Sequence, residues 1–193
     1  MKLLPLLALL AFVSPVVAED LPVLATPDFQ SPLDATWKIA HGTYEPKDGV
    51  LVCAEKPENK HVAVLWHQVG WNSGVIECEF RFDGSKILIL GCDGTTPKGL
   101  AHIGRVVIGP KMISIAEDSV KPSHTIAKAP ADLKTGVWHR LSFAWSGDRI
   151  SLKVNDLIVE TVHPYLATGK TRSWIAVGGQ TASIRALKIS GKP

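Results

Sequence analysis

The chain of 193 residues has few cysteines and little imbalance of charge, and both shortages restrict its function. Its three cysteines show no CxxC or CxxH spacing, so a structural zinc site is not expected. The 21 basic and 18 acidic residues are spread along the chain and form no concentrated basic face for a nucleic acid. No window of a dozen residues keeps a helical apolar stripe free of Gly and Pro, which excludes most α/β folds.

The motifs of several common enzyme classes and metal sites are also missing. There is no nucleophile elbow, P-loop or dinucleotide fingerprint. Seven histidines are present, without the HxH or HExxH spacing that places ligands on one element. We therefore expect no cofactor, except that calcium could bind the oxygens of Asp83-Gly84-Ser85 or Asp93-Gly94-Thr95, which plain turns explain equally well.

The N-terminus has the pattern of a short targeting signal. Lys2 precedes an apolar run over residues 3–13, and Val16 and Ala18 occupy the positions that a signal peptidase reads. The run is shorter than the roughly 20 residues that span a membrane. The pattern predicts a signal peptide at 1–18, a single domain at 19–193, and a secreted or periplasmic protein. An oxidising compartment would allow one disulfide among Cys53, Cys78 and Cys92, and the spacing does not choose the pair.

Short apolar or alternating runs fill the rest of the chain, separated by turn signals every eight to twelve residues. Many short strands at this spacing are typical of an antiparallel β-sandwich or barrel. The clearest strand is 74–82. Its alternation puts Ile76, Cys78, Phe80 and Phe82 on a core face and its charged residues on the other face. Residues 93–100 and 118–135 have weak strand signals, and long loops often carry recognition residues.

Three segments carry a family resemblance. They are Phe29…Leu33…Trp37…Gly42-Thr43-Tyr44…Asp48-Gly49-Val50-Leu51, Glu77-Cys78-Glu79-Phe80-Arg81, and Trp138-His139-Arg140-Leu141…Val154-Asn155-Asp156. They resemble the opening, the E-F-R strand and the W-x-x-L…V-N-G hairpin of the 3-keto-disaccharide hydrolase domain. That family consists of secreted sandwiches with a concanavalin A-like jelly roll, so the resemblance implies this fold and a carbohydrate partner.

The same resemblance leaves two functions open. One is a hydrolase that cleaves a 3-keto-glycoside or related glycoside in a concave cleft. The other is a non-catalytic module that binds glycans or another surface. The family's Asn-Ser-Gly strand is missing from 85–90, and 102–108 lacks the acidic residue of its Gly-Tyr-Glu strand. These departures favour binding, whereas the coverage of the whole mature chain favours hydrolysis.

Candidate site residues follow from both hypotheses. Glu77 and Glu79 are about 7 Å apart at Cα on one strand face, a spacing that a pair of glycosidase carboxylates can use, and Arg81 would position one of them. A solvated strand face is the alternative. Sugars also pack on exposed indoles, for which Trp66 and Trp71 are the expected residues. His61 and His102, which open strands, are the expected site histidines.

Overall fold

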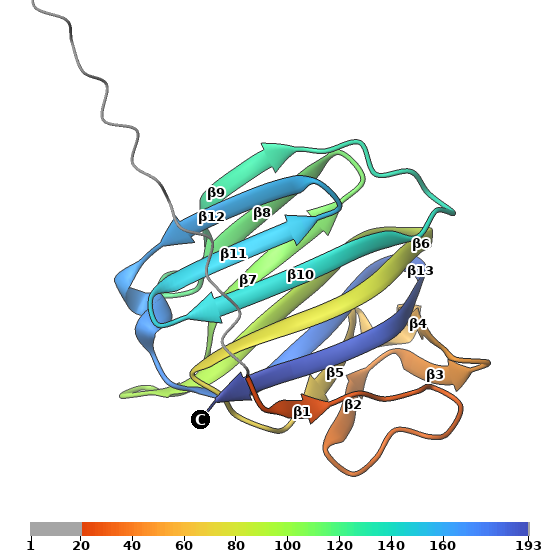
Figure 1. Cartoon of the computed structure of the whole chain (residues 1–193), viewed down its shortest axis with the longest axis horizontal. Helices are drawn as coiled ribbons and strands as arrows, with labels where there is room; N and C mark the ends of the chain where they lie inside the picture. Colours follow the sequence, from red (N-terminus) through yellow and green to blue (C-terminus); the bar gives the residue numbers. More distant parts are fainter. Residues whose placement is uncertain (1–20, 193) are drawn as a thin grey trace, which may run out of the picture.

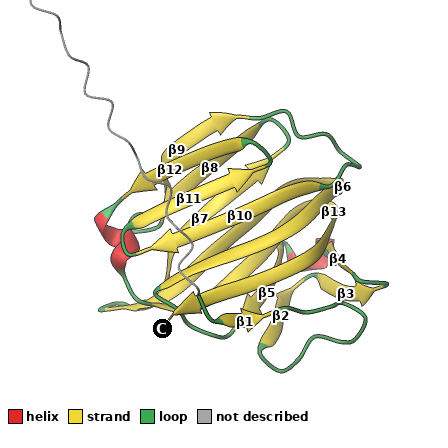
Figure 2. Cartoon of the chain, in the orientation of Figure 1, coloured by secondary structure: helices red, strands yellow, loops and turns green. Residues whose placement is uncertain are grey.

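The structure is a computed structural model that describes residues 21–192. The predicted signal peptide, residues 1–18, lies outside the described residues. Antiparallel strands make up most of the described chain, which confirms the predicted all-β class (Figure 2). The two helices in this part are short 3-10 turns, η1 (Pro57–Asn59) and η2 (Pro164–Ala167). Within residues 21–192, no helix has the length and apolar character needed to cross a membrane.

The strands of the described chain differ greatly in length, from three residues to more than twenty. They are β1 (Val23–Ala25), β2 (Trp37–His41), β3 (Thr43–Lys47), β4 (Val50–Ala54), β5 (Ala63–His67), β6 (Ser73–Thr96), β7 (Gly99–Gly109), β8 (Met112–Glu117), β9 (His124–Pro130), β10 (His139–Ser146), β11 (Arg149–Val154), β12 (Leu157–Val162) and β13 (Lys170–Lys192).

Two stacked layers are formed by these strands (Figure 1). Sheet I contains β12, β11, β10, the first half of β6 and the second half of β13, with β1, β4 and β3 beside β13. Sheet II contains β9, β8, β7, the second half of β6, the first half of β13, β5 and β2. All pairings are antiparallel, as the sandwich prediction requires.

The long strands β6 and β13 pass through both layers and pair with each other along almost their whole length. The ladder shifts register where they cross from one layer to the other, between Gly178 and Ala182 of β13. Gly179 and Gly84 face this crossing with φ values of +100° and +102°. Glycine adopts such angles without steric cost. The crossing therefore lets β6 and β13 each belong to both layers, with one half of the strand in sheet I and the other half in sheet II.

The core between the layers follows the alternation seen in the sequence. Ile76, Cys78, Phe80 and Phe82 are all buried there, as predicted. The hairpin of β10 and β11 contributes its own alternating set, Leu141, Phe143, Trp145, Ile150, Leu152 and Val154. Cys53, Cys78 and Cys92 are free and buried. Burial raises the pKa of all three thiols, that of Cys78 to about 12. They act as small apolar residues in the core.

Two predicted turns are wrong. Asp83-Gly84 and Asp93-Gly94 both lie inside β6, and the reversal after it falls at Pro97-Lys98 instead. Pairing with β13 keeps the chain extended at both dipeptides, and β7 also pairs with Gly94 on the other side. The cooperative ladder thus overrides a local turn preference.

Truncating a core residue of β6 tests the layer assignment. Phe80→Ala is expected to lower the free energy of unfolding by about 3–5 kcal/mol, because the ring is fully buried between the layers. Glu77→Gln, on the exposed face of the same strand, is the matched control and should change it by less than about 0.5 kcal/mol. Urea unfolding of both variants measures this, and equal effects would contradict the orientation of β6.

Candidate functional site

The outer face of sheet II carries side chains from five neighbouring strands in register. One row across the sheet aligns Lys38, Trp66, Trp174, Gly91 and Arg105. Because side chains two residues apart share a face, a neighbouring row lies two residues along most of these strands. On β7 a bulge pairs Asp93 with His102, three residues from Arg105. One flanking row is polar and the other is apolar. The face therefore changes character along the strands.

The polar row centres on Asp93, whose side chain is only 2% exposed. Its Oδ1 accepts hydrogen bonds from Nδ1 of His102 at 2.5 Å and from Nε1 of Trp174 at 2.8 Å. Its Oδ2 is paired with Nε and Nη2 of Arg172 at 2.7 and 2.6 Å. A buried carboxylate is stable only when it is satisfied in this way. Asp93 thus holds three side chains, from β7 and β13, in fixed orientations.

The ionisation of Asp93 follows from these partners. Burial alone would raise the pKa of its carboxyl group, but the hydrogen bonds and charges of His102 and Arg172 outweigh burial and lower it overall. Asp93 is therefore an anion at neutral pH. Since an ionised carboxylate only accepts hydrogen bonds, Nδ1 of His102 must carry a proton, which leaves its Nε2 for another partner. The His102 side chain is 53% exposed, so that atom is accessible.

Trp174 lies flat across Gly91 of the neighbouring strand. A Cβ atom at Gly91 would stand 2.3 Å from Cζ2 of the indole. Only glycine leaves room for this close approach. The indole is 4% exposed and also lies beside His102, with ring centroids 5.2 Å apart. The indole thus contacts both the Asp93 carboxylate and the His102 ring and restricts their positions.

Two arginines lie over the indoles of the central row. The guanidinium carbon of Arg172 is 3.8 Å from the ring centroid of Trp66, and that of Arg105 is 5.9 Å from the ring centroid of Trp174. Stacking and ion pairing together restrict both side chains.

Arg105 also fastens a loop at the end of β8. Its Nε donates to Asp118 at 3.1 Å, and its Nη2 bonds both Asp118 and Ser123. Ser123 in turn donates to Asp118 at 2.5 Å. The loop between β8 and β9 is thereby tied to the sheet face.

The polar groups around Asp93 and Asp118 line a cavity of about 530 Å³, and Trp66 and Trp174 lie outside its lining. It is large enough for a small ligand or one or two sugar residues. Both weak-signal stretches named from the sequence contribute to its wall. The lining residues are Asp93, Leu100, Ala101, His102, Arg105, Asp118, Lys121, Pro122, Ser123 and Arg172.

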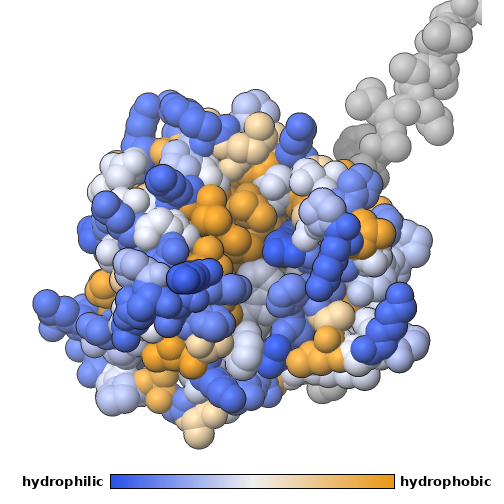
Figure 3. All heavy atoms as spheres, turned by 180° about the vertical axis from the view of Figure 1, so that it is seen from behind, coloured by the Kyte–Doolittle hydropathy of each residue, from blue (hydrophilic) through white to orange (hydrophobic). Residues whose placement is uncertain are grey.

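An apolar strip continues from this cavity along sheet II. Val64, Ile89, Trp174 and Ala176 form a buried cluster separate from the main core, and the partly buried Trp66, Ile87 and Val107 pack against it and present the apolar surface. Figure 3 views the molecule from the side of sheet II and shows hydrophobic side chains gathered in the middle of the face, with hydrophilic ones around them. A polar cavity beside an apolar strip offers hydrogen bonds and a flat apolar contact to the same ligand.

The structure brings together two of the four predicted substrate-binding residues. His102 bonds Asp93 directly, and Trp66 joins the same network by stacking under Arg172, which is paired with Asp93. His61 lies elsewhere, stacked on His41 with ring centroids 4.4 Å apart.

The expected exposure of Trp71 is wrong. Its side chain is 1% exposed and packs edge-on against Trp145. Gly74 and Gly191 leave the space that its indole fills, since a Cβ on either would lie within 3 Å of it. A residue next to a turn is thus drawn into the core by two small neighbours.

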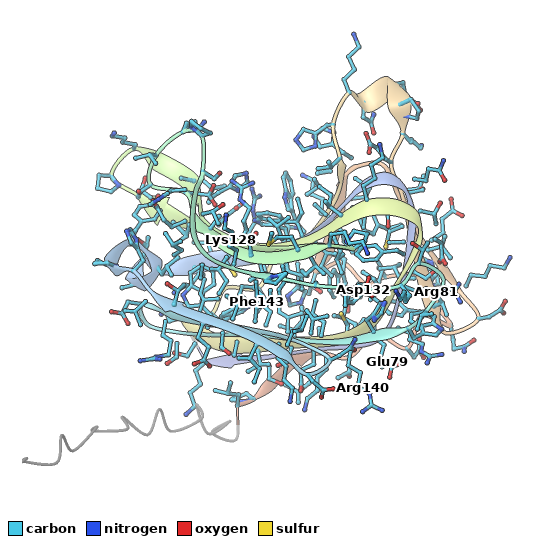
Figure 4. All side chains as sticks on the ribbon, turned by 90° about the horizontal axis from the view of Figure 1, so that it is seen from above. Glu79, Arg81, Lys128, Asp132, Arg140 and Phe143 are labelled. Carbon is cyan, nitrogen blue, oxygen red and sulfur yellow. The ribbon has the colours of Figure 1, made fainter. Side chains whose placement is uncertain are left out.

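The three predicted catalytic residues share one face, as their alternation indicates, but that face is the outer side of sheet I. Figure 4 shows Glu79 and Arg140 projecting from sheet I, away from sheet II, with Phe143 between the layers. Glu79 is paired with Arg185 at 2.7 Å and with Arg140 at 3.7 Å. Arg81 is paired with Asp83 at 2.7 Å, and Glu77 is exposed. None of the three predicted residues lines the cavity.

The sequence does not predict Asp93, Arg105, Arg172 and Trp174 as members of one site. A signal was present, because Arg105 precedes apolar Val107 on the same face, and Arg172 precedes Trp174 and Ala176 in the same way. A charged residue at the end of an apolar outward-facing run indicates the polar end of a groove. The pairing of β6 with β7 and β13, which brings the three runs together, is a long-range property that no local pattern contains.

The two aspartates considered for calcium do not fit a calcium site. Asp93 is surrounded by N–H donors, and Asp83 binds Arg81 and Ser183. Calcium requires six to eight oxygen ligands, whereas these carboxylates face cations and donors. Among residues 21–192, no three His, Cys, Asp or Glu side chains lie close enough to hold a metal ion.

Comparison with known proteins supports the fold. No family model matches the chain and no curated protein matches it, so the resemblance to the 3-keto-disaccharide hydrolase domain is not confirmed. Solved structures do match, and three of them represent different activities.

The first is the carbohydrate-binding module CBM66 from Bacillus subtilis, with a TM-score of 0.65, 11% identity, and coverage of 81% of this chain and 96% of the module. The second is SCLam, a non-specific endo-β-1,3(4)-glucanase of family GH16, with a TM-score of 0.65, 13% identity, and coverage of 90% of this chain and 92% of the glucanase. The third is the exoplasmic/lumenal domain of VIP36 in its Ca²⁺/Man-bound form, with a TM-score of 0.56, 12% identity, and coverage of 80% of this chain and 82% of that domain. The predicted lectin- and glucanase-type jelly roll is therefore confirmed.

Gly91 offers a test of the site's internal packing. Gly91→Ala is expected to push the Trp174 indole off Asp93 and to lower the free energy of unfolding by about 1–3 kcal/mol. Gly109→Ala is the matched control on an adjacent strand, since its Cβ would meet nothing closer than 3.6 Å. Urea unfolding and the indole N–H resonance of Trp174 report both effects. An unmoved resonance in Gly91→Ala would contradict the geometry.

Proposed function

We propose that this protein binds carbohydrate on the outer face of sheet II, between the Asp93 network and the apolar strip. The observation that carries the proposal is the joining of two kinds of surface. Arg172 and His102, both oriented by Asp93, line one end, and the partly buried Trp66 indole with its aliphatic neighbours continues from it. A sugar ring has hydroxyl groups at its rim and apolar C–H faces, so it can use both surfaces at once.

The comparisons support carbohydrate as the class of ligand. CBM66 is a carbohydrate-binding module, SCLam a glucanase and VIP36 a protein whose structure holds mannose, and all three share this fold. Fold alone does not carry function, so the residues of the site must. A signal peptide at residues 1–18 is part of the proposal, because export would bring the protein to extracellular polysaccharide.

Binding is proposed in preference to hydrolysis because of where the carboxylates lie. A glycosidase needs an acid and a nucleophile or base on either side of the scissile bond. Asp93 is held by an arginine, a histidine and an indole, and Asp118 by Arg105 and Ser123. The finer prediction, a 3-keto-glycoside hydrolase that uses Glu77, Glu79 and Arg81, requires a second site on sheet I. Release of reducing sugar by the wild type, and its loss in Glu79→Gln, would be the sign of that activity.

Trp66 provides the direct test. We expect Trp66→Ala to weaken retardation in polysaccharide-containing gels by about tenfold, on the order of 1–2 kcal/mol, because the ligand loses its aromatic contact and Arg172 loses its support. The gels contain laminarin, xylan, galactomannan, dextran, polygalacturonate or dextran sulfate. EDTA should leave the retardation unchanged, since the calcium candidates do not fit.

Trp138→Ala is the matched control for this experiment. Trp138 also supports an arginine, with the guanidinium carbon of Arg185 4.1 Å from its ring centroid, but it does so beside Glu79 on sheet I. This variant should bind like the wild type. Absence of retardation in every gel, or an equal loss in both variants, would contradict the proposed function.

A further inference from the structure

We propose that the sheet II site selects acidic saccharides, whose carboxylate or sulfate group is bound by Arg105 and Arg172. This inference rests on the proposed function and specifies its ligand. The chemistry that the site recognises is an oxyanion carried on a sugar ring, and the ring itself occupies the apolar strip.

The first support is that the acidic side chains of the cavity are more deeply buried than the basic ones. The carboxylates of Asp93 and Asp118 are 2% and 6% exposed, whereas the side chains of Arg172 and Arg105 are 19% and 22% exposed. The acids therefore lie beneath the bases. A ligand that enters the cavity meets guanidinium groups before it meets any carboxylate.

Unused donors are the second support. Arg172 engages Asp93 through Nε and Nη2, and Arg105 engages Asp118 and Ser123 through the same two nitrogens. Within the described chain, neither Nη1 atom has a hydrogen-bond acceptor. Each guanidinium thus keeps N–H groups for an incoming oxyanion, which is the partner that its planar fork matches best.

The charge balance of the cavity is the third support. Its lining holds three permanent cations, Arg105, Lys121 and Arg172, against the two carboxylates, so one positive charge is in excess. Lys121 is exposed and has no ion-pair partner among the described residues. One anionic ligand group would complete the balance in a partly enclosed space, where electrostatic attraction is stronger than in open water.

Preorganisation of the two guanidinium groups allows the site to discriminate acidic saccharides from neutral ones. Stacking on Trp66 and Trp174 and pairing with buried carboxylates fix both guanidinium groups before a ligand arrives. A site built for a charged group rejects the analogue that lacks it, because its donors are then left unpaired. Neutral polysaccharides of the same backbone should consequently bind much more weakly.

The test compares matched polysaccharide pairs by isothermal titration at 150 mM NaCl. The first pair is oligogalacturonate and its carboxyl-reduced form, and the second is dextran sulfate and dextran. Each pair keeps the backbone and changes the charge. We expect the acidic member of at least one pair to bind at least about tenfold more tightly than its neutral partner. Preference in the first pair identifies a carboxylate ligand, and preference in the second a sulfate ester.

Variants locate the binding. Arg172→Gln should weaken acidic binding at least about tenfold. Arg185→Gln is the matched control, because Arg185 also pairs with a carboxylate and stacks on an indole, but on sheet I. It should bind normally. Lys121→Gln removes only an exposed charge and cannot unfold the chain through a lost contact, and it should weaken acidic binding about threefold.

The outcomes separate this inference from the function on which it rests. Equal affinity for both members of each pair, with Trp66 still required, would overturn acidic selectivity and leave carbohydrate binding intact. Equal losses in Arg172→Gln and Arg185→Gln would overturn the location. Binding to neither pair, together with no retardation in the neutral gels, would overturn the proposed function itself.

Discussion

The site depends on one buried carboxylate. Asp93 lies in β6 where that strand is paired on both sides, with β7 and with β13. Its two oxygens collect donors from both neighbours: His102 from β7, and Arg172 and Trp174 from β13. A carboxylate that is only 2% exposed is poorly solvated, so the three donors stabilise the fold as well as orienting the site. Stability and ligand binding therefore depend on the same contacts.

The molecule contains two clusters of similar composition with different surroundings. On sheet I, Arg185 pairs with Glu79 above Trp138, and on sheet II, Arg172 pairs with Asp93 beside Trp66. The sheet I carboxylate is 27% exposed, whereas that of sheet II is 2% exposed and lines the cavity. Exposed ion pairs contribute little to stability or specificity. Depth and enclosure, rather than residue type, distinguish the proposed site from a solvated strand face.

Local pattern was a good guide to the fold and a poor guide to the site. Alternation correctly assigned the core face of 74–82 and the hairpin of β10 and β11, because burial of one face leaves a period of two in the residues themselves. The same alternation placed Glu77 and Glu79 together but carried no information on which sheet face is hollow. The sequence predicts a turn at Asp93-Gly94, because a local Asp-Gly preference is visible in it and the pairing partners that override this preference are not. Trp66 and His102 were found as single residues, but their meeting around Asp93 depends on strand order.

The indole N–H resonances of the six tryptophans give the most direct test of where the ligand binds. Titration of the wild-type protein with oligogalacturonate and with dextran sulfate, followed by ¹H–¹⁵N correlation spectra, reports on both faces at once. With either ligand that binds, the resonances of Trp66 and Trp174 should shift while those of Trp71, Trp138 and Trp145 stay in place. A shift confined to Trp138, beside Glu79 on the opposite sheet, would contradict the account.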